Sequence, residues 1–442
     1  MNSAQNTRGG KLNEVRLAAP VPLPPRRIRR FFSCLGPGLI TGAADDDPSG
    51  ISTYSVAGAS FGYAQLWTAL FSFPLMVAVQ LMCARLGMVT GQGLAGVVRR
   101  RYPRTVLWGA CALLVVANVV NIGADLGGMA EVTEMVTGIR APFWTPCYAA
   151  LIVSLLFWSS YKHIARVFKW LTLVLFAYVG AAFLARPDWG AVLRATFVPR
   201  VEWSGAYLAT FVGILGTTIS PYLFFWQAAE EVEEERAMGR LTVRQRRGAT
   251  DEELSGARTD VATGMFFSNL AMYFIILTTA ATLHAHGQTD IETARQASEA
   301  LRPLAGEGAY WLFSLGLLGT GMLGVPVLAG SAAYAVSEAA RWRGSLEDRP
   351  RLSPKFYAVI VVSMLIGLVL NYAGFSAVRM LFWAAVLNGV LAPPLIILVV
   401  LLTSSREVMG DRANPPMLRL LGWVAALVMI VAAVAMFALW RA

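Results

Sequence analysis

The chain has 442 residues, of which 56% are hydrophobic and only 14% are charged. Soluble proteins usually carry about 25% charged residues, so this composition excludes an ordinary soluble globular protein. The formal net charge of +10 is spread over short loops between apolar runs, where Lys and Arg set the orientation of membrane proteins. We therefore expect a polytopic membrane protein that contacts the lipid bilayer and has no nucleic-acid partner.

The first 30 residues are polar and Pro-rich, and they end in "PVPLPPRRIRR". They lack the apolar core and the small-residue cleavage site of a signal peptide. We expect residues 1–30 to form a disordered cytoplasmic tail and residues 31–442 to form one transmembrane transporter domain.

Eleven apolar runs are long enough to cross a bilayer as helices, which requires about 20 residues. They cover residues 36–61, 65–89, 106–137, 144–161, 167–185, 205–230, 261–283, 309–338, 356–374, 378–403 and 417–440. Arginine-rich loops follow every second run, beginning with "RRRYPR" after the second one. Because basic loops favour the cytoplasmic side, we predict a multi-pass protein of the plasma (inner) membrane, with its N-terminus in the cytoplasm and its C-terminus outside.

Two of the runs contain sequence that does not suit a continuous helix in lipid. The first run is interrupted by "DDDPSG" and the sixth by "GTTISP". Proline removes an amide donor and disfavours helix in the residue before it. Non-helical backbone at membrane depth is tolerated only where it lines a cavity or is buried in protein.

The spacing of the two breaks predicts an internal symmetry. Each break lies in the first helix of a block of five, residues 36–185 and 205–403. Because five is odd, the second block enters the membrane from the opposite side, which predicts an inverted repeat with a binding site at the paired breaks. Residues 417–440 form an extra eleventh helix.

Four segments resemble one family of transporters. "GPGLITGAADDDPSG", "AGASFGYAQLW" and "QLMCARLGMVTGQGLA" resemble the opening of the NRAMP divalent-metal transporters, and "VGILGTTISPYLFFWQ" resembles their sixth helix. The resemblance extends over most of residues 36–403. It implies an all-α membrane protein of the LeuT-type fold that moves divalent metal cations by alternating access. The metal would be the transported ion, and we expect no cofactor.

In the first break, the resemblance implies that Asp47 supplies a carboxylate to the metal. Gly50 stands where the family has an asparagine ligand. Asp46 either binds the ion or caps the second half of the helix, and Ser49 and Thr53 are expected to line the pathway or to support the ligands. A carboxylate at the bilayer centre costs about 2.5–3.5 kcal/mol on insertion scales, so such residues usually belong to a pathway.

In the second break, Thr217 matches a position whose backbone carbonyl binds the metal in the family. Ser220 replaces a methionine ligand, and Tyr222 and Gln227 replace two histidines. The resemblance therefore implies that Thr217 and Ser220 bind the ion and that Tyr222 and Gln227 line the pathway. Loss of the soft sulfur leaves oxygen ligands, which suit magnesium, calcium and manganese.

The substrate prediction follows from these departures. Fewer protein ligands in a roomier pocket suit an ion that keeps part of its water, as Mg²⁺ does. The pattern is similar to the NRAMP-related magnesium transporters, a branch that lacks the methionine. We predict transport of Mg²⁺, with Mn²⁺ also accepted. The alternatives are a proton-coupled importer of Mn²⁺ or Fe²⁺ and a cation-coupled symporter of an organic solute.

Proton coupling needs a titratable group near the site, and the sixth run contains no histidine. Asp125 in the third run either relays protons or pairs with Arg85 in the second. We predict downhill transport that is not coupled to protons. In the tenth run, Asn388 either reaches the ion or its water shell, or forms a hydrogen bond between helices.

The sixth run ends in "QAAEEVEEE". Gln227, Glu230, Glu231 and Glu234 share one helical face by their spacing. They either line an acidic cytoplasmic exit, with Glu230 deepest, or form a solvated helix end that meets the arginine-rich loop. No phosphate-binding loop or nucleophile–base pair points to an enzyme, and no segment indicates an obligate protein partner.

Overall fold

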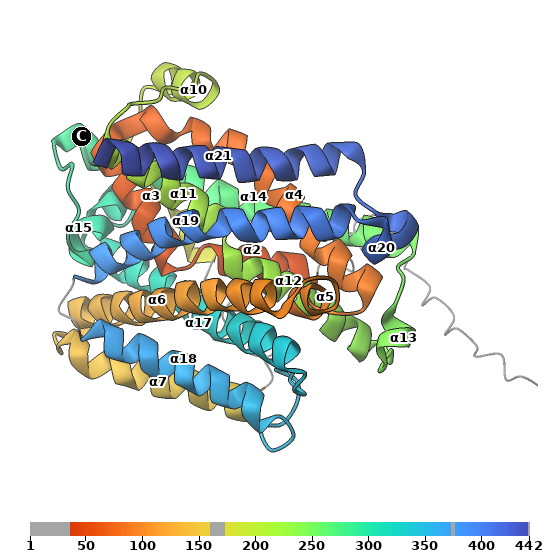
Figure 1. Cartoon of the computed structure of the whole chain (residues 1–442). Helices are drawn as coiled ribbons and strands as arrows, with labels where there is room; N and C mark the ends of the chain where they lie inside the picture. Colours follow the sequence, from red (N-terminus) through yellow and green to blue (C-terminus); the bar gives the residue numbers. More distant parts are fainter. Residues whose placement is uncertain (1–35, 160–172, 373–375, 441–442) are drawn as a thin grey trace, which may run out of the picture.

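The computed structural model describes residues 36–159, 173–372 and 376–440, and all regular elements within these ranges are helices. The predicted cytoplasmic tail, residues 1–30, lies outside the described residues. Figure 1 shows the long helices running side by side as one bundle.

The long elements of the bundle are α2 (Pro37–Asp45) with α3 (Pro48–Phe61), α4 (Trp67–Thr90), α6 (Arg104–Thr137), α7 (Ala141–Trp158), η2 (Leu173–Phe176) with α9 (Ala177–Leu184), α11 (Gly205–Thr218) with α12 (Pro221–Ala237), α14 (Asp251–Thr282), α17 (Ala309–Ala340), α18 (Pro354–Asn371), α19 (Ala377–Ser404) and α21 (Pro416–Trp440). The connections contain η1 (Gly62–Gln65), α5 (Leu94–Arg101), α10 (Trp189–Phe197), α13 (Val243–Arg246), η3 (His284–His286), α15 (Ala294–Ser298), η4 (Glu299–Leu301), α16 (Arg302–Ala305), η5 (Gly306–Gly308), α20 (Arg406–Met409) and η6 (Gly410–Arg412).

The helices agree with the eleven predicted runs. Within the described residues, nine helical segments are long and apolar enough to cross a membrane. The first predicted run is divided into α2 and α3, which are individually short, and the fifth begins among residues outside the described ranges. Two boundaries were wrong by several residues. α12 continues to Ala237 rather than ending near residue 230. α14 begins at Asp251 rather than near residue 261, because Thr250 and Glu253 form a capping box that extends the helix into the loop.

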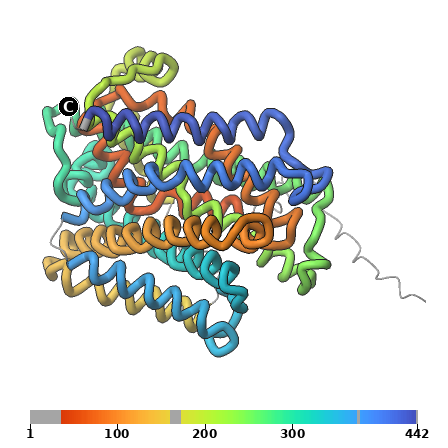
Figure 2. Tube along the Cα trace, in the orientation of Figure 1, coloured from red at the N-terminus to blue at the C-terminus, as the bar shows by residue number. Residues whose placement is uncertain are grey.

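Two opposite faces of the bundle expose large apolar side chains. Figure 1 shows α7 beside α18 along one face and α21 along the opposite one. Large apolar side chains are exposed on these helices, among them Phe143, Val369 and Leu427. Exposed apolar surface of this extent on long helices is suited to lipid. The broken helices lie between these faces, as the colours along the trace also show (Figure 2).

The start of α2 is held by α14. The carboxylate of Asp260 accepts hydrogen bonds from the backbone N–H groups of Gly36, Gly38 and Leu39 at 2.8, 2.6 and 3.0 Å. The first amides of a helix have no partner within it, so a carboxylate is well placed there. Because α14 follows α12 in the chain, the start of α2 lies in the same half of the bundle as the end of α12.

The opposite half holds the end of α3 and the start of α11. The side-chain amide of Gln65 donates to the carbonyl oxygen of Tyr207 at 3.1 Å. The rings of Phe61 and Tyr207 pack edge to face, with centroids 5.2 Å apart. The two broken helices therefore run antiparallel, as the inverted repeat requires.

Glycines bring α14 against the first broken helix. A Cβ atom on Gly42 would lie 2.3 Å from the carbonyl carbon of Gly264, and one on Gly264 would lie 2.1 Å from the carbonyl oxygen of Gly38. Small residues allow such close backbone contact between membrane helices. This crossing fixes α2 just before its break.

We expect Gly42→Val to prevent folding, because the new side chain would collide with backbone that cannot rotate away. Overpacking of a core usually costs about 1–3 kcal/mol, and a collision with backbone at this distance should cost at least that much. The measurement is the yield of monodisperse protein after extraction in detergent. Gly109→Val is the matched control, since no atom lies within 4 Å of a Cβ at that position. Equal yields for the two variants would contradict the close crossing.

Candidate metal-ion site

The first break is formed by Asp46 and Asp47, the two non-helical residues between α2 and α3. Asp47 is extended (φ −68°, ψ 172°) and caps α3: its Oδ1 atom accepts from the N–H of Gly50 at 2.9 Å and from the hydroxyl of Ser49 at 2.6 Å. The role of cap that the sequence left open for Asp46 thus belongs to Asp47. Since Oδ1 holds two donors, Oδ2 is the freer atom to bind an ion.

The second break is formed by Ile219 and Ser220, between α11 and α12. The hydroxyl of Ser220 donates towards the carbonyl oxygens of Gly216 and Thr217, at 3.0 and 2.7 Å. A carbonyl oxygen has two lone pairs, so this bond leaves the Thr217 carbonyl able to bind an ion. The side chain of Thr217 instead donates back to Ile214 at 3.0 Å.

Tyr222 joins the two breaks. Its hydroxyl lies 2.9 Å from the carbonyl oxygen of Ala44 and 3.3 Å from Oδ2 of Asp47. A phenol has one proton, so it can donate to only one of these acceptors at a time. Tyr222 therefore lies next to Oδ2 of Asp47. The sequence predicted only that Tyr222 lines the pathway, and the structure places it at the break itself.

Tyr54 occupies the space next to Gly50, which corrects the expectation of a roomier pocket. A Cβ atom on Gly50 would lie 3.3 Å from Cε2 of Tyr54 and 3.5 Å from its hydroxyl oxygen. Tyr54 is one helical turn further along α3, and its side chain is fully buried. The aromatic ring thus lies against the position at which an asparagine side chain would begin.

The hydroxyl of Tyr54 is a polar group without a partner. It interacts electrostatically with Asp45, Asp46 and Asp47 and lies near the side chain of Thr217, yet it forms no hydrogen bond of good geometry with the described residues. A buried hydroxyl without a hydrogen bond is costly. An ion or water between Tyr54 and Asp47 would satisfy this oxygen.

Asp45 and Asp46 turn towards α14. The hydroxyl of Ser268 lies 2.7 Å from Oδ2 of Asp45 and 3.1 Å from Oδ1 of Asp46. Asp46, predicted as a possible ligand, therefore shares a donor with Asp45 on the side of the break that faces α14. These hydrogen bonds of Asp45 and Asp46 therefore lead to α14 and not to α12.

Four carboxyl groups gather at this depth without a cation. Asp45, Asp46, Asp47 and Asp125 are all at least 95% buried. Among the described residues none of them forms an ion pair with Lys, Arg or His. A buried carboxylate is stable only when it is paired with a charge or bound to a metal, so a cation bound here would stabilise the ionised form of these groups.

Asp125 on α6 faces the first break rather than α4. It interacts with the charge of Asp47 and with the backbone amide of Ser49, although no hydrogen bond reaches either oxygen from a described residue. The proposed pairing with Arg85 was wrong: Arg85 donates to the carbonyl oxygen of Arg412 at 2.7 Å. The side-chain amide of Asn388 takes part in a bond between helices, its Oδ1 accepting from Asn121 at 2.9 Å.

Other predicted pathway residues lie away from the breaks. The hydroxyl of Thr53 donates to the carbonyl oxygen of Ser49 within α3, at 2.7 Å. Gln227 donates to Glu231 at 2.9 Å. Glu230 is buried on α12, about 13 Å beyond Pro221 at 1.5 Å per residue.

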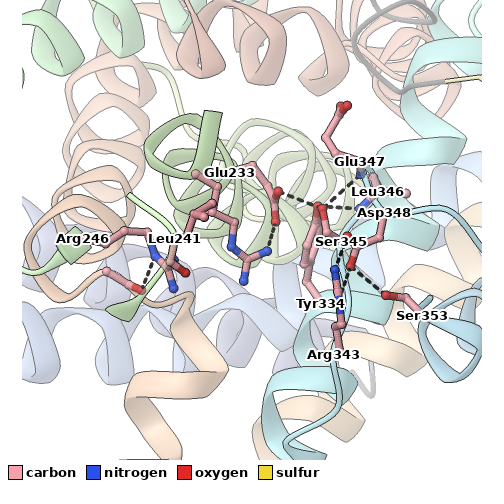
Figure 3. Close-up of polar contacts among 12 residues, drawn as sticks. Glu233, Leu241, Arg246, Tyr334, Arg343, Ser345, Leu346, Glu347, Asp348 and Ser353 are labelled. Atoms are coloured by element: carbon pink, nitrogen blue, oxygen red, sulfur yellow. Dashed lines mark hydrogen bonds and ion pairs between the residues drawn. The ribbon is translucent and has the colours of Figure 1, made fainter. Parts of the chain in front are cut away.

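The acidic end of α12 is covered by protein rather than solvated. Glu230, Glu231, Glu233 and Glu235 are each at most 6% exposed, while Glu234 is half-buried. Figure 3 shows Glu233 directed at the loop after α17, where the hydroxyl of Ser345 donates to it at 2.8 Å. The expected contact with the arginine-rich loop is present, since Arg240 lies 3.7 Å from Glu235, and within α12 Arg236 pairs with Glu233 at 2.6 Å.

Three residues around the first break were not singled out from the sequence: Tyr54, which lies on α3 itself, and Ser268 and Asp260, which lie on α14. Tyr54 is four residues after Gly50, so its helical spacing was a usable signal. Ser268 and Asp260 are more than 200 residues away in the chain, and no local pattern indicates their contacts. Among the described residues, no three His, Cys, Asp or Glu side chains are arranged to hold a metal.

Two antiparallel broken helices that meet at buried carboxyl and hydroxyl groups define the LeuT-type fold, which solved structures of several transporters share with this chain. The family model for Natural resistance-associated macrophage protein-like (Nramp) proteins matches residues 38–439, and the chain belongs to this family. It is therefore a divalent metal cation transporter and not an enzyme. The family resemblance and the fold expected from the sequence are both confirmed.

Relatives with known names cover nearly the whole chain. The divalent metal cation transporter MntH of Xanthomonas campestris is 31% identical over 95% of this chain and 94% of its own length. MntH of Yersinia enterocolitica is 27% identical over 93% of this chain and 96% of its own length. A crystal structure of the Eremococcus coleocola manganese transporter is similar with a TM-score of 0.77 and 18% identity, over 96% of this chain and 89% of that one.

Proposed function

We propose that this protein carries a hard divalent cation, Mn²⁺ or Mg²⁺, across the plasma membrane by alternating access. The observation that supports it is the group of buried carboxyl groups at the first break, which lacks a protein cation among the described residues. The ion would lie between Oδ2 of Asp47, the Thr217 carbonyl and the hydroxyls of Ser220, Tyr54 and Tyr222. Gly50 contributes space for the Tyr54 ring rather than a ligand.

Two arguments rank the substrates differently. The ligand set contains only oxygen, which suits Mg²⁺ and Mn²⁺ alike, and the missing methionine is the feature that favours the magnesium branch. The similar solved structure is named a manganese transporter, which favours Mn²⁺, while the relative from Yersinia enterocolitica is named only for divalent metal cations. The ring of Tyr54 beside Gly50 also removes part of the space that a hydrated Mg²⁺ needs. We therefore place Mn²⁺ first and Mg²⁺ second.

Proton coupling depends on Asp125. An unpaired, buried carboxyl group near Asp47 is suited to exchange a proton when the metal charge arrives, which supports the coupled alternative over the uncoupled transport predicted from the sequence. We place the N-terminus in the cytoplasm and the C-terminus outside, from the arginine-rich loops.

The test is uptake into proteoliposomes that contain the purified protein. We expect Mn²⁺ influx, competition by Mg²⁺, and acidification of the lumen reported by a trapped pH dye. Mg²⁺ influx without acidification would instead support the uncoupled magnesium transporter predicted from the sequence. Absence of flux for both ions would contradict the proposal and favour an organic solute. Liposomes without protein are the control for leakage.

A further inference from the structure

A cavity separate from the metal site lies at the end of the bundle that the arginine pattern predicts to be cytoplasmic. It has a volume of ≈ 180 Å³, far more than one water molecule needs. Its walls come from α5, from the loop that precedes α14 and from α20. Figure 1 shows α5, α13 and α20 at this same end.

The charge of the cavity is positive. Arg100, Arg101, Arg247 and Glu407 line it, together with Thr90, Gln92 and two valines. Arg101 and Glu407 form an ion pair at 2.7 Å. Arg100 and Arg247 are exposed, and neither has an ion-pair partner among the described residues. The guanidinium groups of Arg100 and Arg247 therefore line the same cavity without a carboxylate partner among the described residues.

The wall that carries Arg247 is held in place by its neighbours in the chain. The N–H of Gly248 donates to the carbonyl oxygen of Val89 at 2.9 Å. The buried guanidinium of Arg246 donates to the carbonyl oxygens of Gly91 and Leu241, at 3.2 and 2.7 Å; Figure 3 shows its contact with Leu241. Because residues on both sides are fixed, the backbone of Arg247 has little freedom and presents its side chain to the cavity.

We propose that this cavity binds a phosphate group, with Arg100 and Arg247 as its ligands. The guanidinium fork matches phosphate oxygens in two-point hydrogen bonds. Basic pockets between membrane helices on the cytoplasmic side suit the head groups of anionic lipids. A phosphodiester of such a lipid and a free phosphate share this chemistry, and the experiment separates the two sources.

The experiment measures binding of a dye-labelled, short-chain phosphatidylglycerol to the full-length protein in detergent, by fluorescence polarisation. We expect saturable binding that unlabelled phosphatidylglycerol competes for and phosphatidylcholine does not. Arg100→Gln with Arg247→Gln should weaken it by at least about tenfold, since each basic residue contributes about 1 kcal/mol near an anionic surface. Competition by inorganic phosphate at low concentration would identify free phosphate as a second source.

Two further variants make the result decisive. Arg244→Gln with Arg258→Gln removes the same charge from exposed positions that do not line the cavity, and it should leave affinity unchanged. Glu407→Gln removes the single carboxylate of the cavity and should raise affinity. An equal loss in the control pair, no gain for Glu407→Gln, or binding that does not saturate would overturn the site.

Discussion

Asp47→Asn is expected to lower divalent-cation uptake by at least about 100-fold while the protein remains folded. Loss of a residue that only supports a metal ligand costs about 10–100-fold in affinity, and here a direct, charged ligand is lost. Asparagine is as good a helix cap as aspartate, so the bond from the N–H of Gly50 is retained. The measurement is the initial rate of Mn²⁺ and Mg²⁺ uptake into proteoliposomes.

Asp188→Asn is the matched control for this prediction. Asp188 also caps a helix, accepting from the N–H groups of Gly190 and Ala191 at the start of α10, but it lies outside the broken helices. Its variant should transport like the wild type. If Asp47→Asn retained most of its uptake, Asp47 would not be a ligand and the cation site would have to lie elsewhere.

Gly50→Asn is expected to reduce uptake by about tenfold, although it installs the residue found in the family. The new Cβ atom would lie 3.3 Å from the Tyr54 ring, and the rest of the side chain would have to displace that ring. Overpacking of this kind costs about 1–3 kcal/mol. Adding Tyr54→Ala should recover uptake to within about threefold of the wild type, because the asparagine then has the vacated volume.

The pair is measured as a double-mutant cycle, with Tyr54→Ala alone as the third variant. Tyr54→Ala alone should be harmful as well, because it leaves a cavity and removes a hydroxyl from the site. The two single changes should therefore rescue one another. Strictly additive losses, or no loss in Gly50→Asn, would mean that the ring does not occupy this space in the transporting protein.

Local sequence was sufficient to predict the architecture. Three features carried this prediction: the length of the apolar runs, the arginine-rich loops, and Pro48 and Pro221. Each of them depends only on residues that are close together in the sequence. The breaks therefore appear where they were expected, at Asp46–Asp47 and at Ile219–Ser220. Asp47 was singled out as a buried charge beside the break, but its role as the cap of α3 was not predicted, because capping was considered for Asp46.

The surroundings of the site were decided by contacts between distant segments. Tyr54 fills the space beside Gly50, Ser268 takes Asp45 and Asp46 towards α14, and Asp125 faces Asp47 rather than Arg85. The contacts between side chains of different helices depend on how closely the helix backbones approach. Here glycines such as Gly42 and Gly264 set that distance. A pattern along one chain segment carries no information about that approach, so the partners of each aspartate became known only from the packed helices.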